Sequence, residues 1–482
     1  MTTQYAFSFD ARFCSGCKAC QAACKDKNNL PTGILWRRVV EVSGGTWEKN
    51  GDAWNNTVFA YNLSISCNHC AYPKCAGVCP TDAYVLRENG IVFLDTTKCV
   101  GCGYCAWACP YGAPQYNVDA GHMTKCDFCP DNLEQGLPPA CVAACPLRVL
   151  DYGDLESAGK GLTLWDTPSE AHPYPLPAYA HTQPHLAIMP HPAMSTTEKK
   201  SVANLEEIQP RSSSPWEDVP LLLFTLLVQM AVGGFWAMSW MFAMLWSLVE
   251  HDTTWLRLLP SMLIGASLVA GMLASFAHLG TKKNAWRMLG HLRKSYLSRE
   301  ILFTSLFGLG WLFTMFDNVI GHGNTFELKA ITSVMGIGLI YSMSQVYRFS
   351  AAPGWNSWRT NVGFFISAVL LGLSSMMPIL AYESGVTGIQ VPASQWMLMG
   401  ISLLILLFVQ LVLMHKQVFR NPIRNLRAGL ITIGMMACAI ILFALNLPSL
   451  RVSVFLFLLI VAEEGIGRWI FYASRLADIS AK

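Results

Sequence analysis

The second half of the chain alternates long apolar runs with short polar loops. Each run is close to the ~20 residues that a helix needs to cross the hydrocarbon of a bilayer. Eight such runs favour an all-α integral membrane bundle of eight helices over a bundle buried inside a soluble protein. The expected helices cover about residues 219–248, 258–279, 300–319, 330–347, 361–382, 395–414, 428–446 and 452–472.

The first part of the chain follows a different pattern. Short runs such as TVFAYNLSI (57–65) and GIVFLD (90–95) predict strands. Further on, the stretch AHPYPLPAYAHTQPHLAIMPHPAM is too broken by proline for a regular helix or strand. We therefore expect three parts, with residues 1–155 as a first domain, 156–215 as a Pro- and His-rich extension and linker, and 216–482 as a membrane domain. Because a flexible segment lacks ligand geometry, four histidines of the extension are expected to be solvated or to contact a partner: His172, His181, His185 and His191.

Composition supports a membrane domain. Hydrophobic residues make up 52% of the 482 positions and charged residues only 13%, whereas a soluble protein carries about 25% charged residues. The formal net charge of +3 gives no support to a nucleic-acid partner. The first residues, MTTQYAFSFDARFC, contain neither a charged stretch followed by an apolar one nor a twin arginine, so we expect no cleavable export signal.

The basic residues of the membrane domain gather on one side. An even number of helices returns the chain to the side from which it entered, so this side also carries the first domain. Positive-inside bias then places the first domain in the cytoplasm, at the inner membrane. The alternatives are that the basic loops dock a partner, or that an exported partner carries the first domain to the periplasmic side. The basic side has Lys282, Lys283, Arg287, Arg293, Lys294, Arg299, Arg348, Arg359, Lys416, Arg420, Arg424, Arg427, Arg475 and Lys482, and the other side only Arg257, Lys329 and Arg451.

Sixteen of the 17 cysteines fall into four quartets, and Cys438 of the membrane domain is interpreted as a packing residue. A secreted disulfide scaffold is a poor alternative, because such domains are small and lack a long apolar tail. The quartets are Cys14, Cys17, Cys20 and Cys24; Cys67, Cys70, Cys75 and Cys79; Cys99, Cys102, Cys105 and Cys109; and Cys126, Cys129, Cys141 and Cys145.

The third quartet has the spacing C-x2-C-x2-C-x3-C followed by Pro110. This is the bacterial ferredoxin run, in which the fourth cysteine binds the other cluster of a pair. Zinc also takes four thiolates, but commonly from two separated C-x2-C pairs. The ferredoxin spacing therefore favours iron–sulfur over zinc. Because every quartet is complete, we expect four [4Fe–4S] clusters rather than [3Fe–4S]. Small neighbours such as Gly16 and Gly101 would let backbone N–H groups approach the sulfurs.

Longer motifs resemble a known family. FAYNLSISCNHC, CVGCGYCAWACPYGAPQYN, GHMTKCDFC and CPLRVLDYGDL are similar to the four-cluster electron-transfer subunit of dimethyl sulfoxide reductases. WEDVPLLLFTLLVQMAVGGF, FAHLG, SYLSREI and GRWIFYAS resemble the membrane anchor subunit of the same enzymes, in the expected order. The chain therefore resembles a fusion of two normally separate subunits.

The resemblance implies a ligand set for each cluster. It also implies an α+β domain of two pseudo-symmetric ferredoxin-like modules, in which each module lends a cysteine to the other cluster. The implied sets are Cys14, Cys17, Cys20 and Cys145; Cys24, Cys126, Cys129 and Cys141; Cys67, Cys70, Cys75 and Cys109; and Cys79, Cys99, Cys102 and Cys105.

The resemblance further implies a function as part of a respiratory enzyme. Electrons would run from menaquinol through the four clusters to a separate catalytic subunit that holds a molybdenum bis-pterin guanine dinucleotide cofactor. That subunit would reduce dimethyl sulfoxide or related S- or N-oxides. Its identity chooses the substrate, so a polysulfide, tetrathionate or thiosulfate reductase remains an alternative.

Two residues are candidates for the quinol site. His278, in FAHLG, has a pKa range suited to proton acceptance, and the resemblance ties it to menaquinol. Glu300 opens the next helix, where a helix-dipole partner is the alternative role. In the last helix, Glu464 and Arg468 are four residues apart and can pair. With Glu463 beside them, we expect a structural ion pair here rather than a proton path.

Three other functions fit less well. A formate dehydrogenase or hydrogenase module would carry haem b between paired histidines inside helices, but His251, His278, His322 and His415 fall at helix ends or loops, so we expect no haem. A transporter with a zinc-bound domain would hold four zinc ions instead of iron. A proton pump would need a connected series of carboxylates within its helices, and these are sparse.

Overall fold

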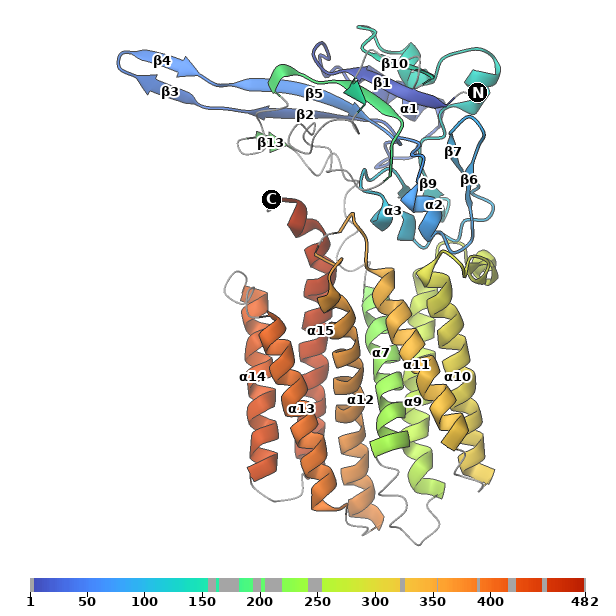
Figure 1. Ribbon diagram of the computed structural model, residues 1–482, viewed down its shortest axis with the longest axis vertical. Coiled ribbons are helices and arrows are strands. Elements are labelled where there is room, and N and C mark those ends of the chain that lie inside the picture. Colours follow the sequence, from blue (N-terminus) through green and yellow to red (C-terminus); the bar gives the residue numbers. More distant parts are fainter. Residues whose placement is uncertain are drawn as a thin grey trace. The chain divides into compact units, whose positions relative to one another are not determined.

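The computed structural model describes residues 4–154, 162–163, 182–193, 201–203, 219–241, 254–320, 326–352, 354–387, 391–414, 422–443 and 449–480. The chain divides into two compact units. Met1–Ser212 and Leu279–Ser295 form the first, which we call the cysteine unit, and Ser213–His278 and Tyr296–Lys482 form the second, the helical unit (Figure 1). The inserted stretch Leu279–Ser295 therefore leaves the helical unit between two of its helices.

Two sheets frame the cysteine unit. The first has the strand order β10-β1-β12-β11, with β1 (Tyr5–Asp10) antiparallel to β10 (Leu150–Asp154) and parallel to β12 (Leu186–Met189). The second has the order β13-β2-β5, in which β2 (Arg38–Gly44) pairs with β5 (Phe59–Ile65) in antiparallel register. β11 is Leu162–Thr163 and β13 is Ser201–Ala203. Most residues of β1, β2 and β5 are at least partly buried, and Phe7, Val40 and Leu63 are fully buried in the core.

Small hairpins and short helices complete this unit. The exposed pair β3 (Trp47–Asn50) and β4 (Ala53–Asn56) follows β2, while β6 (Tyr84–Leu86) pairs with β7 (Val92–Leu94) and β8 (Gln115–Asn117) with β9 (His122–Thr124). The short helices are α1 (Ala19–Lys27), α2 (Lys74–Val78), α3 (Tyr104–Ala108), α4 (Pro130–Glu134) and α5 (Ala140–Ala143). The strands predicted at 57–65 and 90–95 are confirmed as β5 and β7. This mixture of small sheets and helices is the expected ferredoxin-like α+β class.

The prediction that the proline-rich extension contains no strand is wrong. Leu186–Met189 forms β12 between Pro184 and Pro190, because four consecutive residues that can donate hydrogen bonds are enough to pair with β1. His185, just before it, is 5% exposed and its ring contacts the Gln4 side chain, so it is not solvated. His191 stacks on Tyr61. Most of 156–215, with His172 and His181, lies outside the described residues.

The helical unit is a bundle of long helices. α7 (Val219–Trp236) continues as a π-helical turn, η3 (Ala237–Met241), and packs on α9 and α12. α10 packs on α11, α13 on α14, and α12 on α15. The remaining bounds are α9 (Thr254–Ala277), α10 (Tyr296–Ile320), α11 (Phe326–Val346), α12 (Trp358–Thr387), α13 (Ala393–Met414), α14 (Pro422–Phe443) and α15 (Leu450–Ser480). A 3-10 helix, η4 (Lys282–Leu289), lies in the inserted stretch of the cysteine unit.

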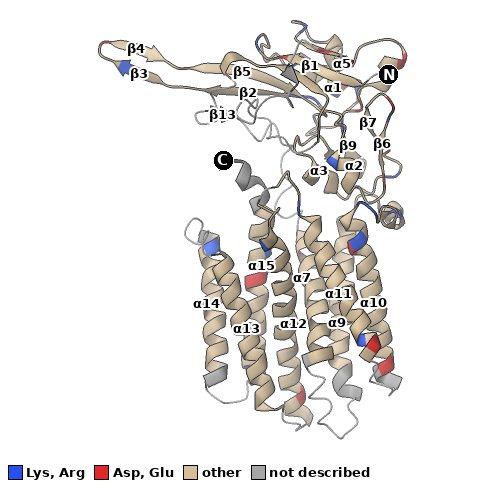
Figure 2. Ribbon diagram, in the orientation of Figure 1, with Lys and Arg blue, Asp and Glu red and all other residues tan. Residues whose placement is uncertain are grey.

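Eight long helices in the described part of the chain agree with the predicted bundle. Seven of them are long and apolar enough to cross a membrane, and α15 differs because it carries Arg451, Glu463, Glu464 and Arg468. Large apolar side chains such as Leu309, Phe313 and Phe408 are exposed on the outer surfaces, as expected for lipid contact. Figure 2 shows how few charged residues interrupt these helices. The chain is a multi-pass membrane protein.

Candidate functional site

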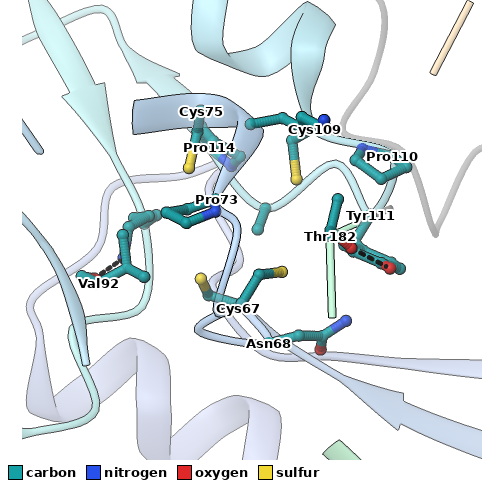
Figure 3. Close-up of a pocket in the computed structure, with 14 residues that line it drawn as sticks. Cys67, Asn68, Pro73, Cys75, Val92, Cys109, Pro110, Tyr111, Pro114 and Thr182 are labelled. Carbon is teal, nitrogen blue, oxygen red and sulfur yellow. Dashed lines mark hydrogen bonds between the residues drawn. The ribbon is translucent and has the colours of Figure 1, made fainter. Parts of the chain in front are cut away.

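Four cysteines surround a cavity of about 380 Å³ in the cysteine unit. Cys67 and Cys70 follow β5, Cys75 lies in α2, and Cys109 ends α3. Figure 3 shows sulfurs from these segments facing one space, beside Tyr111 and Thr182, whose hydroxyl groups are 2.9 Å apart. Cys109 thus shares one cavity with three cysteines of the preceding quartet.

A second cavity, of about 340 Å³, is lined by Cys14, Cys17, Cys20 and Cys145. Gly16 has a φ of 70°, which favours glycine and lets the chain turn between the first two of these cysteines. Cys20 lies in α1, and Cys145 follows α5, which packs on α1. The packing of these two helices brings the first and last quartets of the sequence together.

The other eight cysteines also form two groups of neighbours. Burial raises the pKa of Cys24 to about 12, and the nearby Cys141 and Cys129 add to the rise. Cys126 has Cys24 and Cys141 among its neighbours. Burial likewise raises the pKa of Cys102 to about 12, with a contribution from Cys79 and Cys99.

Cys105 completes the last of these groups, because Cys102, Cys79 and Cys99 all act on its thiol. These neighbours include the cysteines of each ligand set that the resemblance implies, and thiols of different sets also lie close together, since Cys67 acts on Cys126 and Cys141 acts on Cys20. In the described part of the chain, no three His, Cys, Asp or Glu side chains converge closely enough to hold a single metal ion. The donor set of four thiols around one cavity fits an iron–sulfur cluster.

Three buried cations lie among these thiols, and no motif in the sequence indicated them. Arg37 is 1% exposed, and Arg38 and Lys125 are each 3% exposed. Burial acts to lower the pKa of Lys125, but Cys67, Cys75 and Cys126, together with the Asp127 carboxylate, outweigh it and raise the pKa. A cation so buried needs anionic neighbours, which cluster ligands would provide.

Hydrogen bonds fix the buried cations in place. Arg37 donates from Nη2 to Ser66 Oγ at 2.9 Å, and its guanidinium lies 4.4 Å from the centre of the Phe7 ring. Arg38 donates from Nη2 to the Tyr111 carbonyl at 2.8 Å. Lys125 Nζ donates to the Cys126 carbonyl at 2.9 Å and also to the Val92 carbonyl. Their positions relative to the thiols are therefore set by the fold.

In the helical unit, the candidates His278 and Glu300 lie at one end of the bundle. His278 directly follows α9, and its Nδ1 is buried with no hydrogen-bond partner among the described residues. Glu300 lies in the first turns of α10, is 3% exposed and is within electrostatic range of Tyr347. Within the described residues, no hydrogen bond or ion pair joins His278 to Glu300. Glu300 is a buried carboxyl group, whereas His278 is a half-buried imidazole whose ring also lies close to the Ser275 backbone.

The charged residues of α15 form a polar network different from the predicted one. The ion pair joins Glu463 Oε1 to Arg427 Nε of α14 at 2.7 Å. Within the described residues no ion pair joins Glu464 to Arg468, so that expected contact is wrong, although Glu464 still lies within electrostatic range of Arg468. Glu464 instead accepts hydrogen bonds from Ser367 Oγ at 2.7 Å and Gln410 Nε2 at 2.5 Å. Arg468 donates to Gln229 at 2.8 Å. These three charged residues of α15 thus bind partners on four other helices, α7, α12, α13 and α14, and not one another.

The membrane histidines that bear on haem are only partly described. His278 is at the end of a helix, as the sequence indicated, while His251, His322 and His415 lie outside the described residues. Cys438 of α14 is fully buried, in keeping with a packing residue.

Comparisons with known proteins bear on both units. The model of the family described as DMSO reductase anchor subunit (DmsC) matches residues 213–474, which is more than half of the chain, and a 4Fe-4S dicluster domain matches residues 58–155. The B subunit of the anaerobic dimethyl sulfoxide reductase of Escherichia coli (strain K12) is 48% identical over 190 residues, which is 39% of this chain and 90% of that protein.

Two further relatives match the same part. The probable anaerobic dimethyl sulfoxide reductase subunit YnfG of Escherichia coli (strain K12) is 46% identical over 211 residues, 43% of this chain and all of that protein. The thiosulfate reductase electron transfer subunit PhsB of Salmonella typhi is 39% identical over 159 residues, 33% of this chain and 80% of that protein.

Proposed function

Because the chain belongs to the DMSO reductase anchor subunit family and carries ahead of the anchor a part similar to the B subunit of these reductases, we propose that it oxidises menaquinol and passes the electrons through four [4Fe–4S] clusters to a separate molybdopterin subunit. That catalytic subunit, which holds the bis-pterin guanine dinucleotide, reduces dimethyl sulfoxide or a related S- or N-oxide. The observation that carries the proposal is the gathering of sixteen cysteines into four groups in a chain that also spans the membrane.

The proposed sites hold four thiolates each. Cys14, Cys17, Cys20 and Cys145 would bind one cluster and Cys67, Cys70, Cys75 and Cys109 another, as their cavities suggest. Cys24, Cys126, Cys129 and Cys141 would bind the third, and Cys79, Cys99, Cys102 and Cys105 the fourth. When bound, each cluster supplies a one-electron relay. Metal analysis of the intact chain should find about sixteen irons and sixteen acid-labile sulfides, whereas four Cys₄ zinc sites would give four zincs and no sulfide.

The proposed quinol site uses His278 and Glu300 as proton acceptors. Oxidation of menaquinol releases two electrons to the clusters and two protons, and a group close to its hydroxyls must take each proton. The unpartnered Nδ1 of His278 and the buried carboxylate of Glu300 support this role. A proton acceptor at one end of the bundle can return protons to water without a path through the membrane. No haem takes part in this proposal.

Substitution of His278 tests the site. His278→Ala should abolish reduction of the clusters by a menaquinol analogue while dithionite still reduces all four, as followed by electron paramagnetic resonance. His122→Gln, in the hairpin of β8 and β9, is the control and should leave both reactions unchanged. Undiminished reduction by quinol in the His278 variant would remove this residue from the site. An optical spectrum of the same sample, without b-type bands, tests the proposal that haem is absent.

A thiosulfate or related sulfur compound is the second candidate substrate, because the first part of the chain is also 39% identical to the PhsB subunit. The anchor match favours a dimethyl sulfoxide reductase, since it covers the membrane half specifically. Purifying the complex and assaying the catalytic subunit with dimethyl sulfoxide, an N-oxide and thiosulfate decides between them. The proposed location is the cytoplasmic membrane, with the cysteine unit on the cytoplasmic side.

A further inference from the structure

A stretch of the anchor half packs against the cluster-binding loops. Residues 280–295 begin two positions after His278 and lie in sequence between α9 and α10, yet the structure makes them part of the cysteine unit. The pattern along the sequence showed only a basic loop here. We call residues 280–295 the clamp segment.

The clamp segment begins at a contact between glycines. A Cβ on Gly280 would lie 2.0 Å from the Gly121 carbonyl oxygen, and one on Gly101 would lie 2.4 Å from the same atom. Since backbone atoms cannot move aside as a side chain can, only glycine permits this approach. The next residue, Thr281, donates its N–H to the Val100 carbonyl at 3.1 Å and its hydroxyl to the Gly121 carbonyl at 2.9 Å.

Asn284 forms the central contact of the clamp segment. Its side chain is in η4, is 9% exposed, and donates from Nδ2 to the carbonyls of Thr97 at 2.9 Å and Cys99 at 3.0 Å. Both hydrogens of the amide are therefore used on the stretch that leads into the Cys99 group.

The far end of the clamp segment reaches the other stretch of the same group. His291 Nδ1 lies 2.9 Å from the Cys79 carbonyl, which can only accept, and Ser295 Oγ donates to the Val78 carbonyl at 2.8 Å. Cys79 and Cys99 belong to one group of neighbouring thiols, although they come from different quartets. The side-chain bonds of Asn284, His291 and Ser295 thus all go to the two stretches of this one group.

We propose that the clamp segment holds the Cys79 and Cys99 stretches in place for electron transfer from the quinol site, with Asn284 as its main positioning residue. The inference rests on the proposed function and deepens it, because it assigns positioning residues to one particular cluster site, on a stretch that follows His278 in the chain. The chain itself joins the two, since Gly280 follows His278 by two positions.

The chemistry gives Asn284 an electrostatic effect beyond packing. Its amide N–H groups donate to the carbonyls of Thr97 and Cys99, so the positive end of the amide dipole lies beside the stretch that carries the Cys99 thiol. Donors near a cluster stabilise the reduced form and raise its potential. Loss of the amide removes that stabilisation from one cluster and takes this donor away from the Thr97 and Cys99 carbonyls.

The test compares Asn284→Ala and Asn284→Asp with Lys283→Ala in the intact membrane complex. Lys283 is the exposed neighbour in the same 3-10 helix. Redox titration followed by electron paramagnetic resonance should show one cluster of four shifted to lower potential in both Asn284 variants. We expect about a tenfold change in its reduction equilibrium, which is ~59 mV for a one-electron couple. Asn284→Asp, which cannot donate and adds negative charge, should shift it further, and Lys283→Ala should shift none.

A kinetic measurement accompanies the titration. Reduction by a menaquinol analogue should slow about tenfold in Asn284→Ala while reduction by dithionite keeps its rate. If Asn284→Ala fails to assemble, Ser295→Ala removes a single hydrogen bond and should shift the same cluster by less. Unchanged potentials and an unchanged quinol rate, or equal shifts in all four clusters, would overturn the inference. Failure of quinol to reduce the wild-type chain would overturn the proposed function instead. The shift in potential of the one cluster would in that case still test whether Asn284 of the clamp segment acts on it.

Discussion

At the scale of single residues, Lys125 is buried between two groups of cysteines. Its ammonium group has Cys67 and Cys75 of one group and Cys126 of another as electrostatic neighbours, together with Asp127. In a low-dielectric interior a fixed positive charge lowers the free energy of every added electron nearby. We therefore expect the Lys125 side chain to raise the reduction potentials of the neighbouring clusters as well as to stabilise the fold.

Removing this charge gives a specific expectation. Lys125→Met keeps the length of the side chain and should lower the potentials of the two clusters that it borders, each by about tenfold or more in the reduction equilibrium, or ~59 mV. The matched control is Lys74→Met, because Lys74 lines the same cavity as Cys67 but is exposed. Redox titration of the intact chain measures both. Equal behaviour of the two variants would mean that the buried charge is screened.

Residues differ in how far the sequence can predict them. The sixteen cysteines could be predicted as cluster ligands because their spacing along the chain is typical of iron–sulfur proteins. In the C-x2-C-x2-C-x3-C run, the fourth cysteine is expected to bind the other cluster of a pair. Arg37 and Lys125 could not be found, because the neighbours that permit a buried cation come together only in the folded unit. The same holds for Asn284, whose two acceptors lie almost two hundred positions before it.

At the scale of elements, α15 is joined to α14 by the ion pair of Glu463 and Arg427. The Glu463 side chain is 1% exposed and that of Arg427 17%. Removing one member of a buried pair leaves the other charge without compensation, at a cost of about 3–5 kcal/mol. Arg427→Met should therefore destabilise the bundle strongly.

The partner substitution separates this effect from a loss of packing. Glu463→Gln combined with Arg427→Met should recover much of the stability lost in Arg427→Met alone, as measured by thermal unfolding in detergent. Arg451→Met, at the exposed start of the same helix, should leave the unfolding temperature close to that of the wild type. Additive losses in the double variant would show that the two side chains act independently.

The crossing of α7 and α12 depends on two glycines. A Cβ on Gly233 would lie 1.7 Å from the Ala368 carbonyl oxygen, and one on Gly372 would lie 2.0 Å from the Gly233 carbonyl carbon. Small residues at a helix crossing let two backbones approach closely within a membrane. Gly233→Ala should separate the helices and lower the unfolding temperature in detergent.

A third glycine provides the control for this crossing. Gly363 lies in α12 with no atom within 4 Å of an added Cβ. Gly363→Ala should stabilise the helix by about 0.5–1 kcal/mol, because alanine loses less backbone freedom on folding. A loss of stability in Gly363→Ala equal to that in Gly233→Ala would assign the effect to the lipid-facing surface and not to the crossing.

Elements were predictable where their pattern was long. The eight helices follow from apolar runs of about 20 residues, and the structure extends most of them by a turn or so at their ends. β12 was missed, because proline on either side of a four-residue run hides its pairing with β1, which is far away in the sequence. The ion pair of Glu463 was missed for a related reason, since spacing along one helix says nothing of the helix beside it.

At the scale of the whole molecule, one polypeptide contains what the relatives divide between subunits. A part that makes up 39% of the chain covers 90% of the B subunit of the Escherichia coli reductase, and the anchor family covers residues 213–474. Fusion fixes the ratio of the two parts at one to one. It also makes the clamp segment an internal contact of a single polypeptide, so its hydrogen bonds form at high effective concentration.

The distribution of basic residues predicts how the whole chain lies in the membrane. The ends of α9, α11 and α13 meet the starts of α10, α12 and α14 on one side, and the loops there carry the basic residues, while Arg257, Lys329 and Arg451 are the few on the other. Positive-inside bias places the basic side in the cytoplasm.

Single cysteines introduced at Arg359 and at Gly385, in a chain whose native thiols are protected, should therefore label from opposite sides. Position 359 should react with a membrane-impermeant reagent only after the cells are opened, and position 385 in intact spheroplasts. The reverse result would mean that transport with a folded, exported catalytic partner outweighs the charge bias, and would place the four clusters in the periplasm.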